Sequence, residues 1–174
     1  LGCWLSHVKI WKKIVAEDVD SCLVLEDDII FHSPNENKSF FDNFDDYYNS
    51  LPSDWNIFML GYGGGAIKTI NDKITQLHHP SGTYAYALKN QAAQILSKHY
   101  WPMRGALDSF TGHIFFAGNS TPEAKKSFED NWDKDRCNHT SLYNSQADMS
   151  LITNLKGYAS SVPLVKHGAS NYST

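Results

Sequence analysis

The chain begins with apolar residues at helical spacing. Trp4, Val8 and Trp11 follow one another at steps of four and three residues, and lysines at 9, 12 and 13 fall on the other side. This is the pattern of an amphipathic helix, which we place at residues 3–17. A short, uninterrupted apolar run at residues 21–25 comes next. Such a run predicts a strand that is buried on both faces.

Helical and strand patterns then follow one another, with polar turns between them. The first strand continues through the acidic residues that follow it to residues 29–31. The further predicted helices are 40–48, 90–100 and 122–132, and the further predicted strands are 56–60, 82–88 and 158–165, with a hairpin-like stretch after residue 65. Strands that alternate with helical segments favour an α/β domain with a mixed, mostly parallel sheet. The length of 174 residues, 41% of them hydrophobic, is that of one ordinary domain.

Charge and cysteine content exclude several classes of protein. The net charge is −4 and most basic residues are lysines, so we expect no basic face for nucleic acid or an anionic membrane. Cys3, Cys22 and Cys137 are widely separated and predict neither a disulfide framework nor a zinc ribbon. No apolar run is long enough to span a bilayer, and no signal peptide is recognisable. Because the chain opens at Leu1 without an initiator Met, we expect it to be a piece of a longer protein.

Three acidic residues, Glu26, Asp27 and Asp28, lie between two apolar runs. If residues 21–31 form one strand, Glu26 and Asp28 share one face and Asp27 points to the other. Carboxylates this close repel one another unless a cation neutralises them. Mg²⁺ and Mn²⁺ prefer carboxylate oxygen and leave positions open for phosphate oxygens. These residues therefore predict a divalent metal site, the alternative being a solvated turn whose acids cap a helix.

Several short motifs follow one another in a fixed order. They are Gly2-Cys3-Trp4-Leu5-Ser6-His7, Leu23-Val24-Leu25-Glu26-Asp27-Asp28, Trp55-Asn56-Ile57-Phe58-Met59-Leu60-Gly61, Gly82-Thr83-Tyr84-Ala85-Tyr86, Pro102 with Asp108, and Val162-Pro163-Leu164-Val165. As a series they resemble glycosyltransferase family 25, which includes lipopolysaccharide galactosyltransferases and collagen hydroxylysine galactosyltransferases. The resemblance spans about residues 2–112 and 154–170.

The resemblance implies both a fold and an activity. The fold is the C-terminal portion of a GT-A type domain over residues 1–174 that lacks its N-terminal part and carries a variable insertion at 113–153. Glu26-Asp27-Asp28 stands where such enzymes carry a D-x-D metal motif. The implied activity is inverting transfer of a hexose, galactose or glucose, from a UDP-sugar to a hydroxyl of a glycan or of hydroxylysine, with Mn²⁺ or Mg²⁺ as cofactor. Bacterial relatives would work at the cytoplasmic membrane face and collagen-modifying relatives in the endoplasmic reticulum lumen.

The resemblance also assigns individual residues. Asp108 matches the family's Pro-to-Asp segment and is the candidate base for the acceptor hydroxyl, although its local sequence equally suits a helix N-cap. Asp148 is the rival base. His167 is a candidate third metal ligand beside Asp28 and Glu26, because many GT-A enzymes complete their metal site with a histidine from the C-terminal region. An exposed histidine in the tail is the simpler interpretation of His167.

Two further residues lie within the matched motifs. His7 either orients the acidic segment or is an ordinary core histidine. Gly61 opens a glycine-rich segment that nominally fits the G-x-G-x-x-A dinucleotide fingerprint, but no helical pattern follows it, as that fingerprint requires. We therefore predict a loop beside a substrate cleft, and we group Gly61 with Glu26, Asp27 and Asp28 as residues that bind the donor.

Two other functions fit the residues alone. A carboxylate-based glycoside hydrolase could use Glu26 or Asp28 with Asp108, and the aromatic content of 13% suits a noncatalytic carbohydrate-binding module. In GT-A folds the first strands ordinarily hold uracil and ribose. We therefore expect these 174 residues alone to keep the metal site but to bind a nucleotide sugar weakly.

Overall fold

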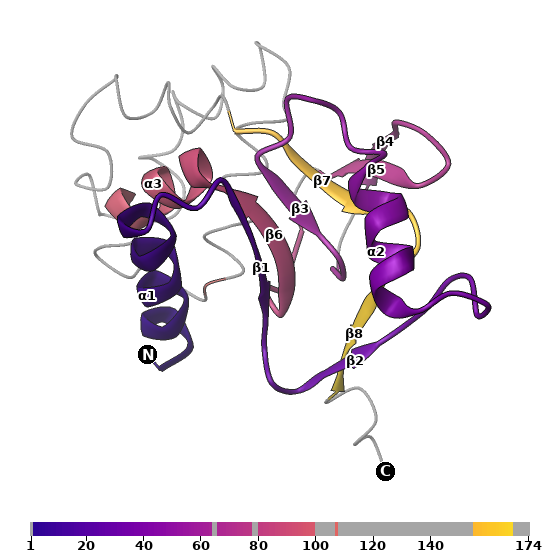
Figure 1. Ribbon diagram of the computed structural model, residues 1–174, viewed down its shortest axis with the longest axis horizontal. Helices are drawn as coiled ribbons and strands as arrows, with labels where there is room; N and C mark the ends of the chain where they lie inside the picture. The colour runs from indigo at the N-terminus through magenta and orange to yellow at the C-terminus, as the bar shows by residue number, and fades with distance from the viewer. Residues whose placement is uncertain (1, 64–65, 78–79, 100–106, 108–154, 169–174) are drawn as a thin grey trace, which may run out of the picture.

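The computed structural model describes residues 2–63, 66–77, 80–99, 107 and 155–168 (Figure 1). Its helices are α1 (Gly2–Ala16), α2 (Phe40–Tyr48) and α3 (Asn90–His99), and its strands are β1 (Ser21–Leu25), β2 (Ile29–Phe31), β3 (Ile57–Met59), β4 (Ala66–Thr69), β5 (Ile74–Leu77), β6 (Ala85–Lys89), β7 (Gly157–Ser160) and β8 (Val165–His167). The predicted helix 122–132 and insertion 113–153 lie outside the described residues. Within them, no helix is both long and apolar enough to cross a membrane.

The described strands form two sheets. Six strands in the order β1-β6-β3-β7-β5-β4 make the main sheet, and β2 and β8 make a separate pair. Only β3 and β7 run parallel in the main sheet, and its other four pairings are antiparallel. The α/β class and the mixed sheet are confirmed, but the expectation of mostly parallel strands is wrong for the described part. An apolar strand pattern reads the same in either direction, so it does not reveal strand orientation.

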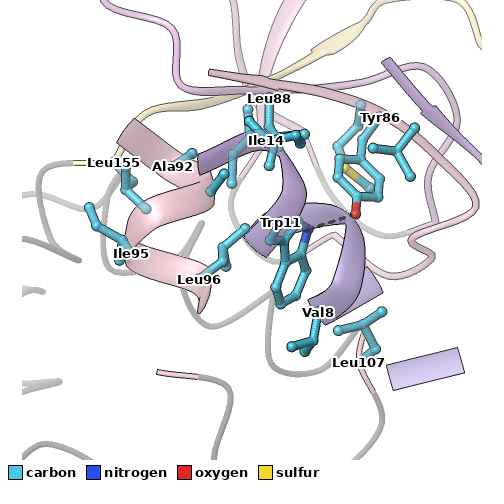
Figure 2. Close-up of a cluster of buried hydrophobic side chains, with 14 of the residues drawn as sticks. Val8, Trp11, Ile14, Tyr86, Leu88, Ala92, Ile95, Leu96, Leu107 and Leu155 are labelled. Atoms are coloured by element: carbon cyan, nitrogen blue, oxygen red, sulfur yellow. Dashed lines mark hydrogen bonds between the residues drawn. The ribbon is translucent and has the colours of Figure 1, made fainter. Parts of the chain in front are cut away.

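The main sheet carries apolar side chains on both faces. Along β6, Tyr86 and Leu88 join a cluster with α1 and α3, whereas Ala85 and Ala87 join a second cluster that includes Tyr47 of α2. Successive strand residues point to opposite faces, so one strand contributes to both clusters. Figure 2 shows the first cluster around Trp11, whose side chain is fully buried.

Strand β1 is less buried than its sequence predicts. It is an edge strand of the main sheet and pairs with β6. Only Val24 is buried in β1, and Leu25 is 37% exposed. The expectation of a strand buried on both faces is therefore wrong, because an apolar run does not distinguish an edge strand from a central one.

The predicted strand 158–165 is divided in two. Strand β7 ends at Ser160, and β8 begins at Val165 and pairs with β2 instead of the main sheet. Pro163 lies between them, and proline has no N–H to donate to a strand ladder. The predicted hairpin after residue 65 is confirmed as the antiparallel pair β4 and β5. Between β7 and β8 the chain therefore leaves the main sheet and reaches β2, the strand that follows the acidic residues.

Candidate functional site

Glu26, Asp27 and Asp28 form a turn between two strands that belong to different sheets. Strand β1 pairs with β6 in the main sheet, whereas β2 pairs with β8. The chain therefore leaves one sheet for another at these residues, and the prediction of one continuous strand through them is wrong. The argument from alternating strand faces consequently does not apply here.

Backbone hydrogen bonds hold both ends of this acidic turn. Glu26 N–H donates to the carbonyl oxygen of Tyr84 at 2.8 Å, and Gly168 N–H donates to the carbonyl oxygen of Asp28 at 2.7 Å. A Cβ on Gly168 would lie 2.4 Å from that same Asp28 oxygen. The close approach of the segment after β8 to the turn therefore requires glycine at this position.

Glu26, Asp28 and His167 come together at the turn. Each offers one ligand atom, and these atoms all lie within 4.8 Å of one another. His167 Nε2 lies 3.2 Å from Asp28 Oδ2. The register of the β2–β8 pair, in which Ile29 lies opposite His167, accounts for this proximity. His167 thus lies in a strand beside the turn and not in a tail.

The His167 ring also contacts the ring of Tyr84. The ring lies edge-on to Tyr84, with 5.5 Å between the centroids. Burial raises the pKa of the Tyr84 phenol above its usual value. Tyr84 therefore contacts the site twice, through its ring at His167 and through its backbone carbonyl at Glu26. Sequence reasoning assigned no role to Tyr84, although its position in the motif before β6 was the available signal.

This set of side chains suits a hard or borderline divalent cation. Carboxylate oxygen is the preferred ligand of Mg²⁺ and Mn²⁺, and imidazole also binds first-row metals. Glu26, Asp28 and His167 could supply three ligands and leave further coordination positions to other molecules. Asp27 is exposed and belongs to neither group of potential ligands found among the described residues.

Gly61 lies at the end of β3, where β8 begins close by. A Cβ on Gly61 would lie 2.2 Å from the carbonyl oxygen of Val165 and 2.6 Å from the Tyr84 ring. The adjacent Leu60 carbonyl accepts a hydrogen bond from the N–H of Leu164 at 2.8 Å. This position therefore needs glycine for packing, and its contact with a donor stays a prediction. The next described element is strand β4 and not a helix, which excludes the dinucleotide fingerprint.

Behind Glu26 lies a buried network of polar side chains. His7 is only 3% exposed. Its Nε2 lies 3.0 Å from Glu26 Oε1, and its Nδ1 lies 2.7 Å from the Tyr86 hydroxyl. Trp11 Nε1 donates to the same hydroxyl at 2.9 Å (Figure 2). His7 therefore lies in the core and also contacts the acidic turn, and a role in orienting that turn stays a prediction.

Cys3 lies on the other side of Glu26 from the proposed metal ligands in sequence and also contacts its carboxylate. Cys3 Sγ lies 3.8 Å from Glu26 Oε1, and Cys3, His7 and Glu26 form a second group with ligand atoms within 4.8 Å of one another. The candidate bases Asp108 and Asp148 lie outside the described residues, so the structure does not place them.

Comparison with known proteins gives a family and several relatives. The family model described as "Glycosyltransferase family 25 (LPS biosynthesis protein)" matches residues 1–111. Human procollagen galactosyltransferase 2 is 32% identical over 63 residues, which are 35% of this chain and 9% of that protein. Zebrafish (Danio rerio) procollagen galactosyltransferase 1 is 28% identical over 102 residues, which are 55% of this chain and 17% of that protein. The matched parts thus span less than a fifth of the length of either relative.

Proposed function

Because the chain belongs to glycosyltransferase family 25, we propose that it forms the metal-binding part of an inverting, metal-dependent hexosyltransferase. The proposed reaction moves galactose or glucose from a UDP-sugar to a hydroxyl group of a glycan or of hydroxylysine. The observation that carries this proposal is the convergence of Glu26, Asp28 and His167 at the acidic turn. The mixed α/β sheet is compatible with a GT-A type fold.

Backbone contacts position part of the proposed metal site. Asp28, Glu26 and His167 would hold Mn²⁺ or Mg²⁺, which when bound supplies positive charge opposite the diphosphate leaving group. The backbone hydrogen bonds at Glu26 and Asp28 hold two of these residues in place. Such preorganisation would lower the cost of arranging the ligands when the donor binds. Asp28 has the more exposed carboxylate of the two, at 52% against 27% for Glu26, and is therefore the more accessible of the two to an ion from solvent.

An inverting reaction also needs a base for the acceptor hydroxyl. From the family motif we propose Asp108 for this role. Leu107, which precedes Asp108, is buried in the cluster that includes α1 and α3.

The names of the relatives and of the family support the proposed acceptor. Procollagen galactosyltransferases are the curated relatives, and the family description refers to lipopolysaccharide biosynthesis. The first name supports a hydroxyl of a protein as the acceptor, and the second supports a hydroxyl of a glycan. Membership in a glycosyltransferase family favours transfer over the hydrolase and binding-module alternatives.

The test compares Asp28→Asn with a matched control. Asp72→Asn removes an exposed carboxylate at the turn between β4 and β5, at the other end of the main sheet from β1. Mn²⁺-dependent transfer from UDP-galactose and UDP-glucose to a collagen peptide or a glycan is measured in the full-length protein. We expect Asp28→Asn to abolish transfer and Asp72→Asn to retain it. Undiminished transfer by Asp28→Asn would contradict the proposed metal site.

A further inference from the structure

Three side chains that carry a polar atom lie on one face of helix α1. Cys3, His7 and Trp11 are spaced four residues apart, so they lie one above another on the helix. Trp11 contacts the hydroxyl of Tyr86 on β6, and His7 contacts both that hydroxyl and Glu26. A continuous line of hydrogen bonds therefore runs from the core cluster to the acidic turn.

The direction of each hydrogen bond follows from the chemistry of the groups. The indole N–H of Trp11 can only donate, so the Tyr86 oxygen accepts at that contact. Burial raises the pKa of the Tyr86 phenol far above its usual value, and Tyr86 therefore keeps its proton. Among the described residues, the His7 Nδ1 atom lies 2.7 Å away and can accept that proton. An Nδ1 atom that accepts a hydrogen bond leaves the ring proton on Nε2.

We infer that Trp11 and Tyr86 hold His7 as the Nε2–H tautomer, and that His7 is a positioning residue which donates to Glu26 and orients its carboxylate toward Asp28 and His167. This inference rests on the proposed function, because it concerns the same metal site. The hydrogen bond anchors Oε1 of Glu26 at 3.0 Å from Nε2 and restricts rotation of the carboxylate. A carboxylate has several lone pairs, so the anchored group can still bind a cation.

The same network disfavours a second metal site at Cys3, His7 and Glu26. Thiolate, imidazole and carboxylate are the ligands of zinc, and their ligand atoms are close enough here. A zinc ion on Nε2, however, would place the ring proton on Nδ1, facing Tyr86. The Tyr86 hydroxyl would then receive two N–H donors, and its own proton would lose His7 as an acceptor in a site that is 4% exposed. A buried donor without an acceptor is costly.

The first test observes the tautomer directly and needs no metal. Imidazole ¹⁵N chemical shifts of the metal-free chain distinguish protonated from unprotonated ring nitrogens. We expect a protonated Nε2 and an unprotonated Nδ1 for His7, and a mixture of both tautomers in Tyr86→Phe. A protonated Nδ1 in the wild-type chain would overturn the assignment.

The second test measures the affinity for Mn²⁺ by calorimetric titration. Loss of a residue that orients a metal ligand typically weakens affinity by about 10–100-fold, and we expect a loss of this size for His7→Leu. His7→Gln keeps an N–H donor near the Nε2 position and should recover most of the affinity. Thr75→Val, which removes a buried hydroxyl from β5, is the control for general destabilisation and should bind Mn²⁺ normally. Circular dichroism melts of every variant check folding, and Tyr86→Phe replaces His7→Leu if the latter does not fold.

The outcomes separate this inference from the proposed function. If Asp28→Asn weakens Mn²⁺ binding but His7→Leu does not, the positioning role is wrong and the metal site stands. If both variants bind Mn²⁺ as the wild type does, the proposed metal site itself is wrong. A zinc titration covers the remaining alternative, since tight Zn²⁺ binding that is lost in Cys3→Ala would assign a metal to His7 Nε2 and overturn the inference.

Discussion

His167 Nε2 lies 3.2 Å from Asp28 Oδ2, although the two residues are far apart in the sequence. The antiparallel pair β2 and β8 brings them together, with Ile29 opposite His167, and β8 runs beside β2 in Figure 1. The candidate metal site is therefore completed by a strand that lies outside the main sheet.

Replacement of His167 should affect the metal more than the fold. The His167 side chain is 39% exposed, and substitutions at exposed positions usually change the free energy of unfolding by no more than about 0.5 kcal/mol. We expect His167→Ala to unfold at nearly the wild-type urea concentration while binding Mn²⁺ more weakly. Calorimetric titration and urea unfolding of the same sample measure both quantities. Wild-type Mn²⁺ affinity in this variant would exclude His167 as a ligand.

Gly61→Ala should destabilise the protein. The added methyl group would lie 2.2 Å from the Val165 carbonyl oxygen, so the backbone at the start of β8 has to move. Overpacking of this kind typically costs about 1–3 kcal/mol, which urea unfolding would show as a lower midpoint. Gly2→Ala is the matched control, because a Cβ there meets nothing within 4 Å. Equal midpoints for the two variants would contradict the packing role of Gly61.

Gly168→Ala should damage the metal site locally. Its Cβ would lie 2.4 Å from the Asp28 carbonyl oxygen and would disturb the hydrogen bond from Gly168 N–H to that atom. We expect Mn²⁺ affinity to fall several-fold, because Asp28 shifts relative to His167. The measurement is Mn²⁺ titration beside Gly2→Ala. Unchanged affinity would show that the backbone contact does not position Asp28.

Tyr158 predicts a pH dependence of stability at alkaline pH. Burial, together with a hydrogen bond from its hydroxyl to Asp54, raises the pKa of Tyr158 to about 12, above the value of about 10 for an unfolded chain. The folded state therefore holds this proton more tightly, and the resulting stability is present below about pH 10 and is lost as the pH rises toward 12. We expect Tyr158→Phe to lose less stability than the wild type between these values. Urea unfolding across this pH range measures the difference, and parallel curves for the two proteins would contradict it.

The sequence located the acidic turn but not its geometry. Apolar runs on both sides of Glu26, Asp27 and Asp28 predicted acids at the end of a strand, and β1 does end at Leu25. A period-two pattern assumes a continuous strand, so it missed the change of sheet at these residues. For the same reason, the proximity of Glu26 and Asp28 was predicted from an argument that does not hold in the structure.

Local sequence patterns could not predict that β8 places His167 beside Asp28. His167 became a candidate only through the resemblance to glycosyltransferase family 25, because its partner Asp28 is distant in the sequence and the two meet through strand pairing. The helix α1, by contrast, was predicted almost to the residue from its apolar spacing. Its polar contacts through His7 and Trp11 depend on Tyr86 of β6, which is a tertiary relationship that no pattern within α1 contains.

The most direct test of the proposed metal site is anomalous X-ray diffraction from crystals of the protein grown with Mn²⁺ and UDP. We predict one manganese peak at the acidic turn, within bonding distance of Asp28 and of Glu26 or His167, with the diphosphate on its open side. A manganese ion bound elsewhere, or UDP bound with no metal at the turn, would contradict the proposed function.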